Sequence, residues 1–332
     1  MDQPPHVLGK APGKHHRQGL TLFEVAQKFA DEDAAIAYLE SVRWPDGPHC
    51  PDCGSFNVQA NIRHKTMTHR CRDCPRKPFF SLRKGTIMQS SKLPYRVWAV
   101  GVYLFTTNLK GISSLKLHRE LGIGQKTAWF MLQGLRKAAE NQEPMFSGPA
   151  EVDETYFGGK RKNMSKSKRA TMTGRGTAGK TAVVGVKDRT TGKVAAEFVH
   201  STDSETLQGF VRYQVKVGST VYTDDASAYV GLTDYAHSSV KHSVGEYVKE
   251  IDIHTNGIES LWSMFKRGFV GTYHKMSPKH LNRYVAEFTY RHNVRESDTM
   301  DQMAVLVRNM GPKRLRYRDL IADNGLDSTA RP

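Results

Sequence analysis

Three acidic residues stand in segments whose patterns would allow them to act together on a phosphate group. Asp153 lies in "AEVDETYFG", which is typical of a strand, and Asp224 lies near the end of the strand-like "STVYTDD". Glu259 lies in "NGIESLWSMFKRGF", which is typical of an amphipathic helix. Mg²⁺ prefers oxygen ligands, and two such ions can hold the attacking and leaving oxygens of a phosphoryl transfer. Spacing alone does not establish this site, because acidic residues are common at strand ends.

Two neighbouring residues are alternative ligands. Asp225 follows Asp224 directly, and because adjacent strand residues point to opposite faces, only one of them can join the site. Asn256 precedes Glu259 by about one helical turn and shares its face of the predicted helix, so it could bind a metal ion or orient a ligand.

The four cysteines of the chain form a second chemical pattern. They make two C-x2-C pairs with residues 54–70 between them: Cys50, Cys53, Cys71 and Cys74. Such pairs are typical of tetrahedral Zn²⁺ held by four thiolates, which leaves no open position for catalysis and makes the metal structural. The alternatives are two disulfides or four unrelated buried cysteines. The polar start of the chain has no apolar segment like that of a secretory signal, which favours free thiols and a cytosolic protein.

The elements that must position these residues follow from hydrophobic spacing. Residues 113–121 and 125–139 have helical patterns and are joined by the glycine turn "GIG". This arrangement is typical of a DNA-binding helix-turn-helix, although any helical hairpin can share it. We expect the second helix to present Gln125, Lys126 and Thr127 to a DNA groove.

The second half of the chain alternates between strand and helix patterns, which predicts a mixed sheet with helices on its faces. Asp153 would lie on a central strand and Asp224 at the end of a neighbouring one, while Glu259 would reach them from a helix across the sheet. Residues 160–180 contain eight Lys or Arg and no acid. That composition predicts a loop, which is either simply solvated or able to clamp a phosphate backbone.

The charge balance indicates the kind of partner. Lys and Arg number 49 against 33 Asp and Glu, for a formal net charge of +16. An excess of this size favours a polyanion, most often nucleic acid, because phosphate neutralisation releases counterions. A merely basic surface is the alternative. No apolar run approaches the roughly 18 residues that a membrane-spanning helix needs.

Several motifs in one order resemble the DDE transposases of bacterial insertion sequences. The segments "VDETYFGG", "VYTDDASAY" and "HTNGIESLWSMFKRG" follow the two cysteine pairs and "FSLRKGTIM". They look like the ISXO type, which joins a zinc ribbon to a ribonuclease H-like domain. The resemblance covers roughly residues 20–300. It implies a multidomain protein: a zinc ribbon and helix-turn-helix, then an α/β ribonuclease H-like domain with a mixed five-stranded sheet and flanking helices.

The resemblance also implies roles for individual residues. Asp153, Asp224 and Glu259 match the three acids that hold Mg²⁺ or Mn²⁺, and Tyr229 stands at the offset that selects Asp224 over Asp225. Some members have Asn as the third residue, which keeps Asn256 as an additional ligand candidate. The basic pair at the end of this helix, Lys266 and Arg267, is expected to contact the transposon end. We expect Lys160, Arg161 and Lys162 of the basic loop to contact DNA.

The predicted activity is that of a DDE transposase, a polynucleotidyl transferase that uses two-metal phosphoryl transfer. It would bind terminal inverted repeats and target DNA as a homo-oligomer, cleave strands with water and transfer them. We expect it in the bacterial cytoplasm with the nucleoid. The alternatives are a DNA-binding regulator derived from a transposase and a structure-specific nuclease on the same fold. The expected parts are a tail and helical lead-in (1–44), zinc ribbon (45–84), helix-turn-helix region (90–140), catalytic domain (148–300) and C-terminal tail (301–332).

Overall fold

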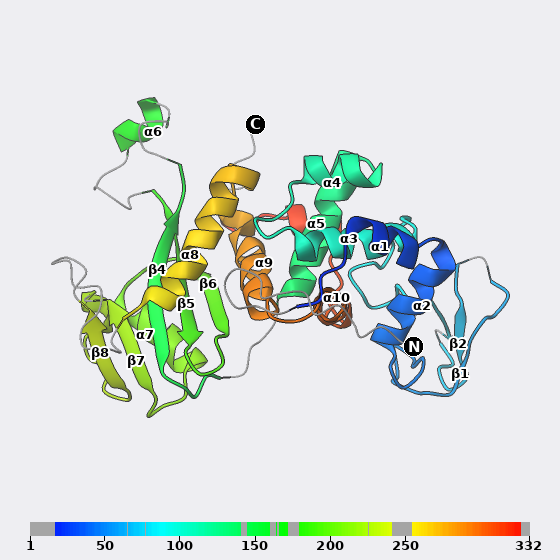
Figure 1. Ribbon diagram of the computed structural model, residues 1–332, viewed down its shortest axis with the longest axis horizontal. Coiled ribbons are helices and arrows are strands. Elements are labelled where there is room, and N and C mark those ends of the chain that lie inside the picture. Colours follow the sequence, from blue (N-terminus) through cyan, green and yellow to red (C-terminus); the bar gives the residue numbers. More distant parts are fainter. Residues whose placement is uncertain are drawn as a thin grey trace, which may run out of the picture. The chain divides into compact units, whose positions relative to one another are not determined.

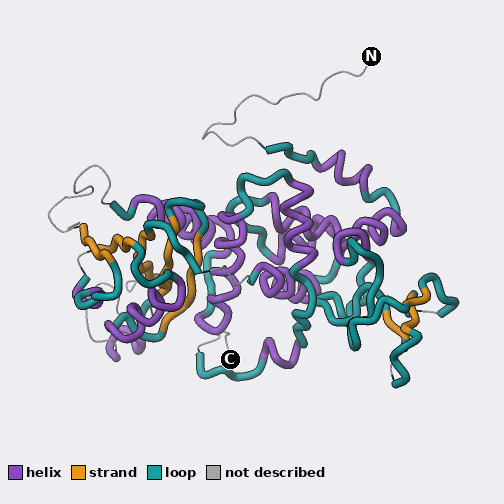
Figure 2. The backbone as a smooth tube through the Cα atoms, turned by 90° about the horizontal axis from the view of Figure 1, so that it is seen from below, coloured by secondary structure: helices purple, strands orange, loops and turns teal. Residues whose placement is uncertain are grey.

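The structure is a computed structural model of the chain. It describes residues 17–64, 66–76, 78–140, 145–159, 164, 166–171, 179–224, 226–240 and 254–326. The chain divides into two compact units, Met1–Glu140 with Val294–Ala322 and Asn141–Asn293 with Asp323–Pro332 (Figure 1). The described strands form two sheets, one of three strands and one of five, and Figure 2 shows them in orange among the purple helices.

The first unit begins with two helices, where the sequence indicated a helical lead-in. They are α1 (Leu22–Lys28) and α2 (Glu32–Arg43). The chain changes direction between them because Asp31 caps α2, its carboxylate accepting a hydrogen bond of 2.8 Å from the backbone N–H of Ala34. A small antiparallel ribbon follows, made of β1 (Val58–Gln59), β2 (His69–Cys71) and β3 (Phe79–Phe80).

An aromatic cluster supports this ribbon. Trp44, at the end of α2, lies 5.1 Å from His69 and 6.1 Å from Phe80, measured between ring centroids. His69 and Phe80 are paired across β2 and β3 and stack at 5.2 Å. All three side chains are buried. These few rings are a small core for a ribbon of this size, so the fold of the ribbon requires a further constraint.

The rest of the first unit is helical. Its helices are α3 (Tyr95–Thr107), α4 (Ser114–Leu121), α5 (Gln125–Ala139), α10 (Thr299–Arg308) and α11 (Tyr317–Ile321). The two predicted helices of the helix-turn-helix are confirmed as α4 and α5, with the turn at Gly122–Gly124 between them. The region expected to be a C-terminal tail differs. It contains α11 and most of α10, and α10 packs against α2, α3 and α5 through buried residues that include Met303 and Leu306.

The second unit contains the five-stranded sheet. Its strands are β4 (Ala150–Phe157), β5 (Thr181–Asp188), β6 (Val194–Val199), β7 (Thr220–Asp224) and β8 (Ala236–Val240), in the order β6-β5-β4-β7-β8. β4, β5 and β6 are antiparallel neighbours, whereas β7 and β8 run parallel to β4. The mixed sheet with helices on its faces confirms the predicted ribonuclease H-like fold class. β8 is a short edge strand with the polar sequence AHSSV, which carries little strand signal.

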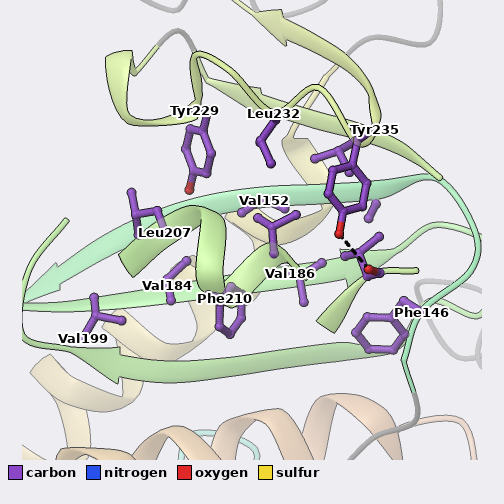
Figure 3. Packing of buried hydrophobic residues seen from close by; sticks show 14 of the residues in the cluster. Phe146, Val152, Val184, Val186, Val199, Leu207, Phe210, Tyr229, Leu232 and Tyr235 are labelled. Carbon is purple, nitrogen blue, oxygen red and sulfur yellow. Dashed lines mark hydrogen bonds between the residues drawn. The ribbon is translucent and has the colours of Figure 1, made fainter. Parts of the chain in front are cut away.

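The two faces of the sheet are covered by different helices. α7 (Ser204–Gln214) packs on one face, where Val152, Val184 and Val186 point toward Leu207 and Phe210 (Figure 3). α8 (Asn256–Gly268) and α9 (Leu281–Asn293) cover the other face (Figure 1). Short turns complete this unit: η2 (Ser227–Tyr229), the π-helical η4 (Phe269–Tyr273) and η5 (Pro278–His280).

The basic segment 160–180 is only partly described. Residues 166–171 form a short helix, α6 (Lys166–Thr171), where a loop was expected. Its sequence, KSKRAT, lacks glycine and proline and contains good helix formers, which explains the difference. Residues 160–163, 165 and 172–178 lie outside the described residues. In the part of the chain that the structure describes, no helix is both long and apolar enough to cross a membrane.

α8 packs closely against the sheet at Gly185, where Trp262 of this helix approaches the backbone of β5. A Cβ atom at this position would lie 2.5 Å from Cη2 of Trp262. We predict that Gly185→Ala lowers the unfolding free energy of the second unit by about 1–3 kcal/mol, because the core becomes overpacked. Urea denaturation measures this change. The control is Gly209→Ala in α7, where a Cβ meets nothing within 4 Å and alanine favours the helix. Equal destabilisation by both substitutions would contradict the packing.

Candidate metal centres

Three carboxyl groups converge where the central strands of the larger sheet end. Oxygen atoms of Asp153, Glu154 and Asp224 all lie within 4.8 Å of one another. The register of β4 and β7 explains the meeting of two of them. Glu151 pairs with Tyr222, so two residues further along both parallel strands Asp153 stands beside Asp224. We call these three groups the carboxylate cluster.

Burial and mutual repulsion raise the free energy of the carboxylate cluster when its groups are ionised. Burial raises the pKa of Asp153 to about 7, and the charges of Asp224 and Glu259 add to the effect. Burial raises the pKa of Glu154 to about 8, with Asp224 and Asp153 adding to it. The hydroxyl of the buried Tyr229 donates a hydrogen bond to Glu154. The cluster therefore retains protons unless another positive charge replaces them, which is the behaviour expected of hard-cation ligands.

Glu259 lies near this cluster without belonging to it. Its charge raises the pKa of Asp153, but it is not one of the three groups that converge within 4.8 Å. Glu259 is half-buried in the first turns of α8, where its carboxylate accepts a 3.2 Å hydrogen bond from the Thr255 hydroxyl. Ile258, Leu261, Trp262 and Phe265 form the buried face of the same helix. The predicted packing of Leu261, Trp262 and Phe265 is confirmed.

The start of α8 is held by a buried acid from the central strand. The carboxylate of Glu151, 2% exposed, accepts a 2.9 Å hydrogen bond from the backbone N–H of Ile258. Thr255, the N-cap residue, provides no side-chain cap. A carboxylate at this end of the helix satisfies a free N–H group and interacts favourably with the helix dipole. Glu151 therefore fixes the position of the turn that carries Glu259.

Arg189 neutralises Glu151 and binds the chain just before α8. Its Nε donates to the Glu151 carboxylate at 2.8 Å, and its guanidinium also donates to the backbone carbonyl of His254 at 2.5 Å. The guanidinium carbon lies 4.2 Å from the centroid of the Tyr222 ring on β7. This network connects β4, the end of β5, β7 and the start of α8.

Gly257 allows the approach of this network to the helix. A Cβ at Gly257 would lie 2.6 Å from both Oε2 of Glu151 and Nζ of Lys187. A side chain at this position would therefore require the Glu151 and Lys187 side chains to shift or α8 to move away from β4. Gly257 thus has a packing function next to Glu259, which its place near the start of the predicted helix does not reveal.

The remaining predicted site residues lie on exposed surfaces. Asn256 is exposed in the first turn of α8, and its role as a ligand stays a prediction. Lys266 and Arg267 are exposed in the last turn of the same helix. At the start of α5, Gln125, Lys126 and Thr127 are also exposed, and the side-chain amide of Gln125 donates to the Ser114 hydroxyl at 3.1 Å. Lys160, Arg161, Lys162 and the alternative acid Asp225 lie outside the described residues.

Two acidic residues of the site were missed by reasoning from the sequence. Glu154 and Glu151 flank Asp153 in "EVDET", and the alternation of a strand places Glu154 on the opposite face from Asp153. Strand alternation alone therefore misses Glu154. Asp224 is the last residue of β7, and its carboxyl group lies within reach of both Asp153 and Glu154. A buried strand that contains three acids in four residues was the available signal.

The four cysteines also converge. One sulfur atom from each of Cys50, Cys53, Cys71 and Cys74 lies within 4.8 Å of the others. The sulfur atoms of Cys53 and Cys71 are 3.6 Å apart, close to the edge of a ZnS₄ tetrahedron, about 3.8 Å for Zn–S bonds of 2.3 Å. All four are free thiols. We call them the cysteine cluster.

Backbone and side-chain hydrogen bonds hold the two cysteine pairs together. The N–H of Gly54 donates to the Cys50 carbonyl at 2.8 Å and closes the first knuckle. The Asp73 carboxylate of the second knuckle accepts from the hydroxyl of Ser55 at 2.5 Å and from the amide of Asn57 at 2.8 Å. Burial and the neighbouring thiols raise the pKa of Cys74 to about 11, so four thiolates need a cation between them.

Known proteins share both regions of this chain. Residues 145–293 match the ISXO2-like transposase domain, and residues 30–77 match the transposase zinc-ribbon domain. An uncharacterized protein in transposable element ISH50 of Halobacterium salinarum is 28% identical over 277 residues, which cover 80% of this chain and 92% of that protein. An uncharacterized transposase-like protein of Haemophilus influenzae is 28% identical over 116 residues, which cover 34% of this chain and 90% of that protein.

The fold and the acidic centre define a ribonuclease H-like domain of the DDE type. Together with the ribbon, this domain makes the chain similar to the ISXO-type transposases of insertion sequences in two separate regions. The resemblance stated from the motifs is confirmed. The family of the ribbon and the geometry of the cysteine cluster together support a structural Zn²⁺.

The cysteine cluster predicts that the ribbon depends on zinc. Purified protein should contain about one zinc per chain, and Cys71→Ser should lose it, because a hydroxyl is a poor substitute for a buried thiolate ligand. The ribbon should then become sensitive to protease while the second unit stays resistant. Elemental analysis and limited proteolysis measure these two effects. A zinc content well below one per chain, or full zinc retention in Cys71→Ser, would contradict the assignment.

The carboxylate cluster predicts how stability varies with pH without added divalent ions. The folded state keeps a proton on Asp153 up to about pH 7, whereas the unfolded chain releases it near pH 4. The folded state therefore binds more protons in this window, and stability falls as pH rises through it. The Asp153→Asn variant does not lose stability in this way. Its unfolding free energy relative to that of the wild type should therefore rise by about 1–4 kcal/mol between pH 4 and 8. Urea denaturation across this range measures it, and a constant difference would contradict the environment of Asp153.

Proposed function

We propose that this protein binds the terminal inverted repeats of an insertion sequence and catalyses metal-dependent cleavage and transfer of DNA strands. The observation that carries the proposal is the carboxylate cluster at the ends of the central strands, with Glu259 close enough to raise the pKa of Asp153. The similarity to known proteins provides the substrate class, since both matched regions resemble transposase domains.

Asp153 and Asp224, with Glu259 approaching from α8, are the proposed ligands of Mg²⁺ or Mn²⁺. Bound ions would activate the attacking oxygen and stabilise the leaving oxygen at phosphorus. Glu154, hydrogen-bonded to Tyr229, is a fourth carboxyl group for this centre. Glu151 and Arg189 have a positioning role, because they fix the start of α8 and hence Glu259. Asn256 stays a candidate for an additional ligand.

DNA would be bound by basic and polar residues of both units. In the second unit, Lys266 and Arg267 are exposed about two turns after Glu259, where a cation would contact the transposon end. Lys160, Arg161 and Lys162 would add phosphate contacts. In the first unit, the exposed start of α5 would enter a DNA groove through Lys126 and Thr127, with Gln125 beside them. A homo-oligomer would bring two transposon ends together.

Two other functions would use the same residues differently. A DNA-binding regulator would keep the carboxylate cluster only as part of the scaffold, yet the raised pKa values of Asp153 and Glu154 show that the cluster destabilises the ionised fold. That favours a catalytic use. A structure-specific nuclease would cleave DNA without strand transfer, and only a reaction with a target can separate it from a transposase.

Asp153→Asn should abolish metal-dependent cleavage of a duplex taken from the end of the element that encodes this chain. We expect a loss of more than about 10²-fold, since even indirect partners of metal ligands change activity by 10–100-fold. DNA binding should be retained. The matched control is Glu205→Gln, an acid-to-amide change at an exposed position of α7. Gel analysis of cleavage and a binding titration measure the two properties.

The outcomes separate the three functions. Cleavage that survives in both Asp153→Asn and Asp224→Asn would exclude the proposed centre. Wild-type protein that binds the duplex and never cuts it would indicate a regulator. A pre-cut end with a free 3′-hydroxyl, incubated with a plasmid target, should give joined products with a transposase and none with a nuclease.

A further inference from the structure

A groove of about 900 Å³ lies in the first unit beside the start of α5. The groove has α5 on one side and, on another, the segment that follows α10, residues 313–318, which we call the C-terminal arm. Its lining contains five cationic side chains and no acidic one; the cations are Lys92, Lys126, Arg314, Arg316 and Arg318. We call it the cationic groove. It includes two residues, Lys126 and Thr127, that the sequence had predicted to face DNA.

Most of these charges are available to a ligand. All five cationic side chains are exposed. Asp319 is the nearby acid, and it accepts two hydrogen bonds from Arg316, at 2.5 and 2.9 Å, and lies 3.8 Å from Arg318. The charge of Arg314 also acts on Asp319, although among the described residues the salt bridges of Asp319 are with Arg316 and Arg318. One acid cannot neutralise five cations, so the groove attracts anions.

Contacts at two points hold the C-terminal arm against α5. At the end of the helix, the Lys313 ammonium donates to the carbonyl oxygens of Ala138, at 3.3 Å, and Glu140. A cation there binds free carbonyl groups and interacts favourably with the helix dipole. Further along, the ring of Tyr317 meets the ring of Phe130 edge-on, with centroids 6.0 Å apart.

These two contacts set the direction of the arm. Ala138 and Phe130 are about 12 Å apart along α5, at a rise of 1.5 Å per residue. Tyr317 follows Lys313 by four residues, and four residues of extended chain span about 13 Å. The arm therefore runs back along α5 toward the start of that helix. Leu315 is buried, whereas its neighbours Arg314 and Arg316 are exposed, and the backbone at Arg316 is extended, with φ −98° and ψ 144°.

We propose that the cationic groove binds the sugar-phosphate backbone of the duplex that α5 contacts. This inference rests on the proposed function, because it takes double-stranded DNA as the partner of α5. Alternate residues of an extended chain are about 7 Å apart, which matches the axial rise of about two nucleotides of one strand. Arg314 and Arg316 can thus follow one strand while Lys126 and Thr127 reach the adjoining groove. Contacts to phosphates fix the register of a recognition helix and carry no base sequence.

The test uses the full-length protein and two labelled duplexes, one from the end of the element and one of mixed sequence. Arg314→Gln and Arg318→Gln should each weaken binding to both duplexes by a similar factor. The slope of log K against log salt should become shallower by about 0.9 for each phosphate group that the variant no longer neutralises. Arg314→Lys should keep the wild-type slope because it keeps the charge. The control is Lys28→Gln, which removes one exposed charge on α1, outside the lining of the groove.

Each result supports or overturns the inference. Arginine variants that behave like Lys28→Gln, while the wild type binds DNA, would exclude the groove as a backbone site and leave the proposed transposase intact. A change in self-association with an unaltered salt slope would show that the groove holds an acidic part of a second copy instead. Wild-type protein that binds neither duplex would overturn the proposed function together with this inference. Because the substituted arginines are exposed, thermal unfolding should match the wild type and exclude misfolding.

Discussion

Repulsion among half-buried carboxyl groups is the constraint on which the second unit depends. Asp153, Glu154 and Asp224 meet within 4.8 Å, and two unit charges at about 4 Å repel by about 4 kcal/mol at an effective dielectric constant of 20. A flexible chain would relieve this repulsion by moving the groups apart. Here the parallel strands β4 and β7 hold the groups together, because their pairing at Ala150–Val221 and Glu151–Tyr222 sets the register that leads to Asp153 and Asp224. The sheet therefore holds a site that is stabilised by protons at low pH, and the proposed metal ions would replace these protons when they leave.

The central strand shows how one short sequence gives its acids different environments. Glu151 and Asp153 point to the same face of the sheet and both are mostly buried. Glu151 is neutralised by Arg189 and by a backbone N–H of α8, so it acts as a structural anion. Asp153 has other carboxylates as its neighbours, and the pKa of its side chain rises to about 7. The structural acid holds the helix that carries Glu259, so the environment of Asp153 depends on the neutralisation of Glu151.

Much of this arrangement follows from local sequence, and the rest depends on contacts between distant segments. The cysteine pairs, the helices of the helix-turn-helix, and the strands that carry Asp153 and Asp224 have spacing signals that the structure matches. β8 has no such signal, because AHSSV is a polar edge strand. The roles of Gly257 and Gly185 are set by Glu151 and Trp262, which approach from other elements. The packing of α10 and the course of the C-terminal arm could not be predicted, because their partners on α3 and α5 lie far away in the sequence.

The separation of positive and negative groups has a consequence for the order of events on DNA. A phosphate group approaching ionised carboxylates is repelled, so the carboxylate cluster cannot itself supply affinity for DNA. The net charge of +16 must act from other places, among them the cationic groove beside α5 and the exposed end of α8. Binding and chemistry then have different electrostatic requirements. Under the proposed function, cations outside the cluster can hold the duplex whether or not the cluster is neutralised, whereas a phosphate is repelled by the cluster once Asp153 and Glu154 have lost their protons and no cation has replaced them. In the proposed reaction, metal binding and the approach of the scissile phosphate to the ionised cluster are therefore coupled, while affinity for the rest of the duplex is not.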